Sequence, residues 1–332
     1  MQTLFFENTP RIIATGTVAG PKECPGIIGK YVDKSLSDDM FGESTYEKAE
    51  CKMLSYAISR TIENAALREK DVDLLILGDL LNQIISASFA ARDFSVPFLG
   101  VYSACSTMSE SMALAAAFVN VGYYHDIVAA TGSHFSSAER QYRYPLELGN
   151  TRPPQSQWTV TGAGGTLIST DKTRSHVAIT SATFGKVVDF GITDVNNMGA
   201  AMAPAAANTI LTHLKETGRD ASYYDLIVTG DLGALGSRIL KDLTWEKGVD
   251  IQNNHVDCGE IIYNVVEKEF QGGSGAGCSA VVFNSYIYDK LKKRELNRVL
   301  FAATGALLST VSSGQGESIP CISHAVAIEN VE

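Results

Sequence analysis

Apolar residues along the chain gather in two kinds of segment, and the two kinds alternate. Short, continuously apolar runs are typical of strands that a sheet buries on both faces. The runs are Leu74–Leu77, Ile127–Ala130, Leu226–Val228 and Val299–Ala302. Longer segments carry apolar residues at helical spacing, as in Lys48–Leu67 and Ala200–Thr217. The alternation predicts crossover units, much parallel strand pairing and an α/β fold.

The chain also contains an internal repeat. The segment Val72–Leu81 (VDLLILGDLL) returns as Tyr224–Gly233 (YDLIVTGDLG), with Gly-Asp at the end of each apolar run. Ala104–Ser133 aligns without a gap to Gly277–Ala306, and both copies begin with a small residue followed by Cys-Ser. Self-similarity of this kind is the sequence signature of a duplicated architecture. We therefore expect two related halves packed together as a layered α/β arrangement.

The halves are expected to join at Thr170–His176 (TDKTRSH), a polar segment without hydrophobic periodicity. This places an N-terminal half at residues 1–170 and a C-terminal half at residues 175–332. Such a division suits the length of 332 residues, which is large for one hydrophobic core.

Composition and charge exclude several classes of protein. Hydrophobic residues make up 45% of the chain and charged residues 19%, which indicates a compact globular protein. The net charge of −10 argues against a general nucleic-acid binder. The first residues resemble no signal or transit peptide, so we expect a cytoplasmic location. The mostly apolar run Met112–Tyr124 is too short to span a bilayer. The six cysteines include no CxxC pair, so neither a disulfide framework nor a zinc site is expected.

Cys105 is the first candidate for chemistry. It follows the strand-like run Val96–Ser103 and stands at the start of a helical stretch, with Ser103 and Ser106 beside it. The positive end of a helix lowers the pKa of a thiol there and favours the thiolate. The position therefore suits a nucleophile or an anion site, and it equally suits a small buried filler residue. Cys278 holds the matching place in the second half.

A thiolate nucleophile needs a general base, and His134 and His255 are the candidates that stand out. His134 follows a predicted strand end. His255 lies near Asp257 and Cys258, but the spacing of these three matches no standard zinc site, so we predict no metal site. The other histidines are interpreted as surface or hydrogen-bonded core residues. They are His125, His176, His213 and His324.

The segment Ser133–Trp158 is predicted to be a long loop, and it holds Arg140, Arg143 and Arg152 in an otherwise acidic chain. Loops of this length in compact domains are usually functional, and guanidinium groups suit planar carboxylates. Alternatively, the arginines pair with nearby acids or the loop forms a dimer contact. The nearby acids are Glu139 and Glu147.

The glycine-rich segment Thr159–Ser169 (TVTGAGGTLIS) resembles a phosphate loop only superficially. It lacks the P-loop lysine and the full dinucleotide-binding pattern. We therefore interpret it as a tight backbone crossing beside the pocket.

The duplicated halves, Cys105 at a strand-helix junction and the helix start Gly272–Ala280 (GGSGAGCSA) resemble the thiolase and ketoacyl-synthase superfamily. The resemblance implies a five-layered α-β-α-β-α duplication of two related halves, usually dimeric, with an acyl-accepting cysteine at Cys105. The family's second half normally contributes a histidine and an asparagine to catalysis. Here Gly230 stands at the histidine position, and Gly273 or Ser274 at the asparagine position. The resemblance therefore implies a vestigial nucleophile and no catalysis.

Four longer segments are similar to the stage V sporulation protein AD family. They are Phe41–Leu54, Gly132–Gly164, Gly272–Ala280 and Ala303–Glu329. This resemblance implies a non-catalytic thiolase-like homodimer that binds dipicolinic acid, free or as its calcium chelate, with no resident cofactor. It also implies joint action with the other stage V A membrane proteins, which move dipicolinic acid across the forespore inner membrane in sporulation and germination. The protein is then peripheral to that membrane.

Dipicolinate is a flat pyridine with two carboxylates, so it needs N–H donors, a planar cation and apolar walls. The residues that could supply the polar contacts cluster after two predicted strand ends. They are Ser103, Cys105, Ser106, His134, Arg140, Arg143 and Arg152. One alternative is an acyltransferase or ketoacyl synthase in which Cys105 works with His134 or His255. The other is a purely structural subunit of a membrane transport complex.

Overall fold

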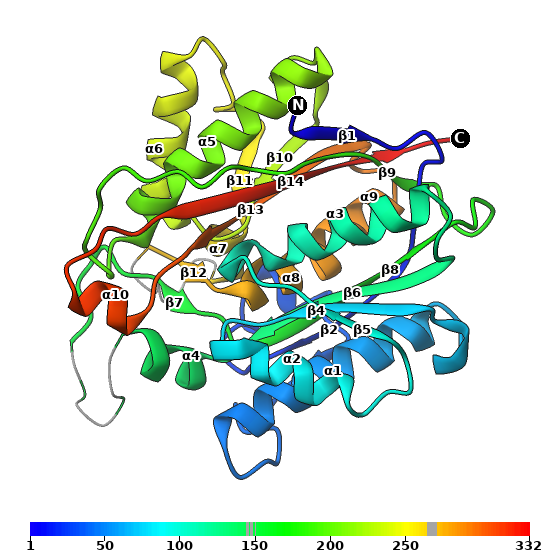
Figure 1. Cartoon of the computed structure of the whole chain (residues 1–332), viewed down its shortest axis with the longest axis horizontal. Helices are drawn as coiled ribbons and strands as arrows, with labels where there is room; N and C mark the ends of the chain where they lie inside the picture. The colour runs from blue at the N-terminus through cyan, green and yellow to red at the C-terminus, as the bar shows by residue number, and fades with distance from the viewer. Residues whose placement is uncertain (144–145, 147–148, 150, 264–270) are drawn as a thin grey trace.

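The computed structural model describes residues 1–143, 146, 149, 151–263 and 271–332. Its strands follow one hydrogen-bonded path, β11-β10-β13-β14-β9-β2-β8-β6-β4-β5. The join between β9 and β2 is the single residue pair Arg11 and Ala178, so the path divides into two sheets. Figure 1 shows the two sheets stacked, one above the other.

The first sheet contains β2 (Arg11–Ala19), β8 (Gly162–Ser169), β6 (Asp126–Ser133), β4 (Leu74–Gly78) and β5 (Phe98–Gly100), in that order. The second contains β9 (Val177–Thr183), β14 (Cys321–Asn330), β13 (Arg298–Ala306), β10 (Leu226–Thr229) and β11 (His255–Asp257). When the five strands of each sheet are numbered by their order along the chain, they lie side by side in the order 1-5-4-2-3 in both sheets. The four strands predicted from apolar runs are β4, β6, β10 and β13.

Short strands complete the sheets. β1 (Thr3–Phe5) pairs with β9 although it lies at the N-terminus, and β3 (Lys34–Ser35) pairs with β2. β7 (Trp158–Thr159) pairs with β12 (Gly273–Ser274) and so joins the two parts of the chain. The division into halves at 170 and 175 falls between β8 and β9 and stays a prediction.

Helices form the other three layers, as the five-layered expectation requires (Figure 1). The first sheet is covered outside by α1 (Tyr46–Asn64) and α2 (Ile85–Ala91), and the second by α5 (Met198–Thr217) and α6 (Gly233–Glu246). Between the sheets lie α3 (Thr107–Asn120), α8 (Ala276–Val282) and α9 (Tyr288–Lys292). The smaller helices are α4 (Phe135–Tyr142), α7 (Cys258–Ile262) and α10 (Thr310–Gly314). The five-layered α/β fold is therefore confirmed.

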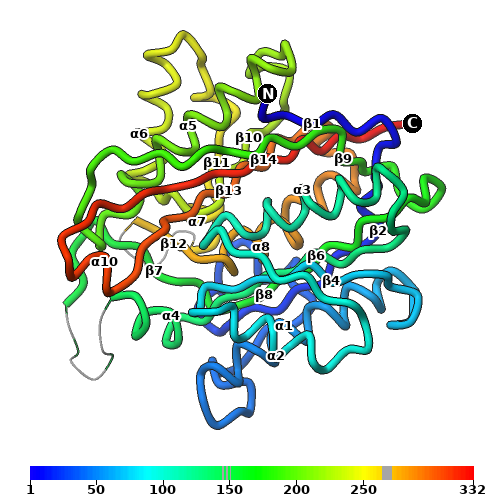
Figure 2. Tube along the Cα trace, in the orientation of Figure 1, coloured from blue at the N-terminus to red at the C-terminus, as the bar shows by residue number. Residues whose placement is uncertain are grey.

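The central layer brings both helix starts of the repeat together between the sheets. The tube in Figure 2 shows α3 and α8 lying between the strands of the two sheets. Buried residues of α3 that face this core are small or flexible, namely Met108, Met112, Ala115 and Ala116. Such residues let a helix approach two sheets at once. Within the described part of the chain, no helix is both long and apolar enough to cross a membrane.

Glycines in β8 allow this close packing. A Cβ added to Gly164 would lie 2.3 Å from the carbonyl oxygen of Ala280 in α8, and one added to Gly162 would lie 2.7 Å from the carbonyl oxygen of Val18. No side chain fits at such distances. The predicted tight backbone crossing in the segment Thr159–Ser169 is thus present, and it is formed by a strand.

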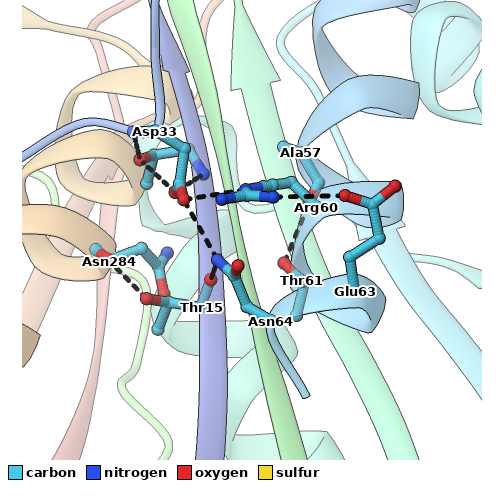
Figure 3. Close-up of polar contacts among 9 residues, drawn as sticks. Thr15, Asp33, Ala57, Arg60, Thr61, Glu63, Asn64 and Asn284 are labelled. Atoms are coloured by element: carbon cyan, nitrogen blue, oxygen red, sulfur yellow. Dashed lines mark hydrogen bonds and ion pairs between the residues drawn. The ribbon is translucent and has the colours of Figure 1, made fainter. Parts of the chain in front are cut away.

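A polar network ties β2 to the helix that continues α8. The π-helical turn Phe283–Ile287 places the Asn284 carbonyl where it accepts a hydrogen bond from Thr15 Oγ1 at 2.7 Å. Figure 3 shows this contact beside Asp33, which accepts hydrogen bonds from Arg60 Nε and Asn64 Nδ2 at 3.0 Å each. The buried hydrogen bond between Thr15 and Asn284 helps to fix the first sheet against the central layer, whereas the contacts of Asp33 lie at the surface.

One expectation about the fold is wrong. The segment Ser133–Trp158 is not a continuous loop, because Phe135–Tyr142 forms α4. His134 caps this helix, and its Nδ1 accepts a hydrogen bond from the Ser136 N–H at 3.1 Å. The sequence did not predict this helix because most of the residues on its buried face are polar, namely Ser136, Ser137 and Glu139.

We predict that Gly164→Ala destabilises the fold by about 1–3 kcal/mol or more, because the new methyl group overlaps backbone that cannot move freely. Gly314→Ala is the matched control, since a Cβ at Gly314 meets no atom within 4 Å. Urea unfolding of both variants measures the effect. Equal stability of the two variants would contradict the packing described here.

Candidate functional site

A pocket lies where the strand ends of both sheets meet the start of the central helices. It is a narrow cavity of about 40 Å³, so a ligand larger than a few water molecules requires its lining side chains to move. Its apolar walls come from both halves of the chain and include Leu80, Ala138, Met198, Ala306 and Leu308. Cys105 lies on its surface, which places the cysteine of the first half where the sequence predicts a site.

Cys105 belongs to the short turn Ala104–Ser106 that leads into α3. Ala104 has a left-handed φ of 51°, a conformation that costs an alanine about 1 kcal/mol or more and is common at functional sites. Burial, followed by the carboxylate of Asp231, raises the pKa of the Cys105 thiol well above its usual range. The expected lowering of this pKa is therefore wrong. Burial and a nearby negative charge outweigh the helix dipole.

Asp231 interacts with Cys105 without itself lining the pocket, and the sequence interpretation missed it. It is fully buried after β10, and its Oδ1 accepts a hydrogen bond from Thr304 Oγ1 at 2.6 Å. Burial raises the pKa of Asp231 to about 7. The repeated Gly-Asp at the strand ends carried the signal, since Asp79 is the matching residue in the first half. Asp79 accepts hydrogen bonds from the Leu81 and Ala87 amides at 2.6 Å each.

A second charged group lies on the pocket's α4 side. The Glu139 carboxylate pairs with Arg143, and with Arg152 Nη2 at 2.6 Å. It also accepts a hydrogen bond from Thr159 Oγ1 at 2.8 Å. All three charged side chains are largely buried, with 4% of Glu139, 6% of Arg143 and 11% of Arg152 exposed. Two guanidinium groups thus share one carboxylate, which leaves one positive charge in excess.

Arg143 and Glu139 are the members of this group that line the pocket, whereas Arg152 does not line it. Arg143 Nη1 faces Glu139, whereas the buried Nε of Arg143 has no hydrogen-bond partner among the described residues. Its charge also reaches Cys105, whose pKa it lowers slightly against the larger opposing effects. A buried N–H donor without a partner is costly, so this atom is the natural contact for an acceptor on a bound molecule.

The other two predicted arginines lie elsewhere. Arg140 forms an ion pair with Glu47 that is partly exposed and is not among the residues lining the pocket. Arg152 stands behind Glu139 and packs over the rings of Phe135 and Trp158. Arg143 and Arg152 both form ion pairs with Glu139, as the alternative interpretation of the arginine-rich segment expects. Glu147 lies outside the described residues.

Ser103, Ser106 and His134 are buried and do not line the pocket. Ser106 Oγ donates to the Ala303 carbonyl at 2.8 Å and accepts from the His324 amide at 3.1 Å, which ties the two halves together. His134 Nε2 lies 2.8 Å from the Asp39 carbonyl, so both of its ring nitrogens are hydrogen-bonded within the chain. The geometry gives Ser106 and His134 structural contacts, whereas the buried Ser103 hydroxyl has no hydrogen-bond partner among the described residues.

Glycine fits tightly at both positions where the superfamily resemblance expects catalytic side chains. A Cβ on Gly230 would lie 3.0 Å from the Ala303 Cα, and one on Gly273 would lie 2.7 Å from Ile262 Cγ2. Among the described residues that line the pocket there is no histidine.

The residues considered for a metal site form structural hydrogen bonds instead. Asp257 accepts hydrogen bonds from Thr229 Oγ1 at 2.6 Å and from the Leu232 and Gly233 amides at 2.9 Å each. His255 Nε2 lies 2.8 Å from the same Thr229 hydroxyl. In the described part of the chain, no group of three metal-ligating side chains could hold an ion.

This geometry suits one kind of ligand. Apolar walls suit a flat ring, and the N–H of Arg143 Nε, which has no partner among the described residues, can donate a hydrogen bond to an anionic oxygen. The raised pKa of Cys105 leaves the thiol in its neutral form at neutral pH.

Comparisons with solved structures find the same fold in condensing enzymes. The chain is similar to 3-oxoacyl-[acyl-carrier-protein] synthase III from Aquifex aeolicus VF5, with a TM-score of 0.58, 13% identity and coverage of 96% and 99% of the two chains. It is also similar to AbyA1, a tetronic acid condensing enzyme, with a TM-score of 0.62, 14% identity and the same coverage. At these identities the likeness concerns the fold, which is thiolase-like.

Sequence comparison is more specific. The family model described as "Stage V sporulation protein AD" matches residues 1–329. The chain is 46% identical over 328 residues to "Stage V sporulation protein AD" of Bacillus subtilis (strain 168), which covers 99% of this chain and 96% of that protein. The match spans both halves and the whole pocket. This chain therefore belongs to the stage V sporulation protein AD family, whose members are sporulation proteins.

Proposed function

We propose that this protein binds dipicolinic acid in the Cys105 pocket during sporulation and germination, without catalysing a reaction. The proposal is supported above all by Arg143, which lines a pocket with apolar walls and whose buried Nε has no hydrogen-bond partner among the described residues. A carboxylate of dipicolinate offers the missing acceptor, and the pyridine ring suits the apolar walls.

Charge in the pocket supports a negatively charged ligand. Arg143 and Arg152 together outnumber Glu139, so a bound carboxylate restores the charge balance that burial demands. Asp231, with its raised pKa, is partly protonated near neutral pH and adds less than a full negative charge. Calcium enters this proposal only as the chelate of the ligand, and the protein carries no cofactor of its own.

The absence of catalysis is part of the proposal. A thiolase-type reaction needs a thiolate together with groups that stabilise the negative charge of the intermediate. Burial and Asp231 hold the pKa of Cys105 high, and glycine occupies positions 230 and 273. These observations favour a binding protein over the acyltransferase alternative.

Family membership supports the proposed setting. We place the protein at the forespore and spore inner membrane as a peripheral component that works with the other stage V A membrane proteins to transport dipicolinic acid. A purely structural role in that complex is the alternative, and it differs in one respect: it requires no small molecule in the pocket.

Thermal unfolding with and without dipicolinate tests the binding role. A ligand at about 100 times its dissociation constant adds about 2.7 kcal/mol of stability, which raises the melting temperature by a few degrees. Arg143→Gln should weaken binding about 10-fold to 100-fold, because a hydrogen bond to a charged group is lost. Calorimetry gives the dissociation constants.

Arg140→Gln is the matched control, since Arg140 lies outside the pocket in a partly exposed ion pair. Its dipicolinate affinity should equal that of the wild type. A stability gain with acetyl-CoA or malonyl-CoA and none with dipicolinate would overturn the proposal in favour of an enzyme. No gain with any of these compounds would favour the structural role.

The proposed protonation of Asp231 predicts a pH dependence. A carboxyl whose folded pKa is raised to about 7 stabilises the fold when protonated, and this stability is lost as pH rises through 7. Asp231→Asn should therefore gain stability relative to the wild type between pH 5 and pH 8, by roughly 2–3 kcal/mol. Urea unfolding at both pH values measures the difference, and a difference independent of pH would contradict the assignment.

We also propose a homodimer. β5 is the edge of the first sheet along the described path, and its Phe98 and Leu99 side chains are each 37% exposed. Phe89 on the neighbouring α2 adds a third exposed apolar group. An exposed apolar edge strand invites pairing with a second strand. The wild type should have the mass of a dimer by light scattering, and Leu99→Lys should shift it toward the monomer; a monomeric wild type would exclude this interface.

A further inference from the structure

A second cavity lies directly outside the Cys105 pocket. This outer groove has a volume of about 400 Å³ and is lined by Leu81–Ile84 and Gly100–Val101. Three residues, Tyr102, Tyr142 and Leu308, line both the outer groove and the pocket. The two cavities therefore share one wall, and two tyrosine rings form much of it.

Hydrogen bonds hold the two tyrosines together across the shared wall. The Tyr142 hydroxyl donates to the carbonyl of Leu80. It lies 3.2 Å from the Tyr102 hydroxyl. Because the Tyr142 hydrogen is used on Leu80, Tyr102 must be the donor in the second bond. The contact Tyr102–Tyr142–Leu80 is thus a directed chain of two hydrogen bonds that closes the pocket on this side.

One side of this wall is fixed and the other is free to move. The Asp79 carboxylate holds the Leu81 and Ala87 amides, so it anchors the segment that carries Leu80. Tyr102, in contrast, is 41% exposed and belongs to no helix or strand. Its ring can turn outward at the cost of one hydrogen bond.

The backbone of the outer groove is strained. Gln83 and Ile84 have left-handed φ angles of 58° and 46°, which are unfavourable for any residue other than glycine and most unfavourable for a β-branched one. Ile84 packs on Gly100, where an added Cβ would lie 2.2 Å from Ile84 Cδ1. Strain of this kind persists where the surrounding structure enforces it, and it is concentrated at functional sites.

We propose that the outer groove is an additional binding subsite through which the ligand passes, and that Tyr102 is the door between this subsite and the Cys105 pocket. The described residues lining the groove carry no charge, and they offer apolar surface with the amides of Asn82 and Gln83. This chemistry suits brief contact with a flat aromatic carboxylate, whereas the charge of Arg143 lies beyond the door. The ligand assignment rests on the proposed function; the door itself does not.

The first experiment separates a door from a binding contact. Tyr102→Phe keeps the ring and removes the hydrogen bond to Tyr142. It should raise both the association and the dissociation rate of dipicolinate about threefold to tenfold, the factor that one hydrogen bond controls. The dissociation constant should stay unchanged. Rates come from stopped-flow fluorescence of Trp158, which precedes the lining residue Thr159, and dissociation constants from calorimetry.

A matched variant narrows the groove without touching the pocket. Gly100→Ala places a methyl group against the flexible end of Ile84. It should slow association and dissociation together. Association and dissociation rates that equal those of the wild type in both variants would overturn the proposal. A changed dissociation constant with an unchanged association rate in Tyr102→Phe would also overturn it.

The second experiment tests the door without dipicolinate. Methyl methanethiosulfonate modifies Cys105 only after it has entered the pocket, whereas Cys24 and Cys51 are partly exposed and serve as internal controls. Mass spectrometry at several pH values should show faster modification of Cys105 in Tyr102→Phe and unchanged modification of the controls. Equal Cys105 rates in wild type and variant would overturn the door even if dipicolinate binds. Faster Cys105 modification without dipicolinate binding would retain the door and reject the ligand.

Discussion

The two sheets share one central layer of helices, and this constraint determines where a pocket can form. α3 and α8 must approach sheets on both sides, so α8 contacts β8 through glycine, and α3 packs with small or flexible side chains. No cavity fits within so dense a layer. One space that remains lies at the end of the layer, where the helices begin and the strands of both sheets terminate. The Cys105 pocket occupies that end.

Duplication supplies the same residues to both halves, and the surroundings give them different roles. Asp79 and Asp231 follow equivalent strands, β4 and β10. Asp79 accepts hydrogen bonds from two backbone amides of its own loop, so it fixes the wall of the outer groove. Asp231 accepts a hydrogen bond from the Thr304 hydroxyl and lies near Cys105, so its negative charge raises the pKa of that thiol. The repeat therefore determines that an aspartate stands at each strand end. The neighbouring hydrogen-bond donors determine what each aspartate does.

The sequence predicted the fold well because buried strands and the repeat are local patterns that need no tertiary information. It predicted Cys105 and Arg143 in the pocket for the same reason, from a strand-helix junction and an unusual arginine-rich segment. Ser106 and His134 do not line the pocket, since partners far apart in the chain, Ala303 and Asp39, take up their hydrogen bonds, and their contact with a ligand stays a prediction. Long-range partners of this kind are not encoded in the spacing of residues.

A thiol and an anion-binding pocket are compatible only if the thiol stays neutral. A thiolate at Cys105 would repel a carboxylate and would itself neutralise the excess charge of Arg143 and Arg152. Burial and the Asp231 carboxylate push the pKa of Cys105 upward, which removes that competition. The arrangement that disfavours a catalytic nucleophile is therefore the same one that leaves the guanidinium charge available to a ligand. In the proposed function, one electrostatic effect therefore both disfavours a thiolate nucleophile and favours the binding of an anion.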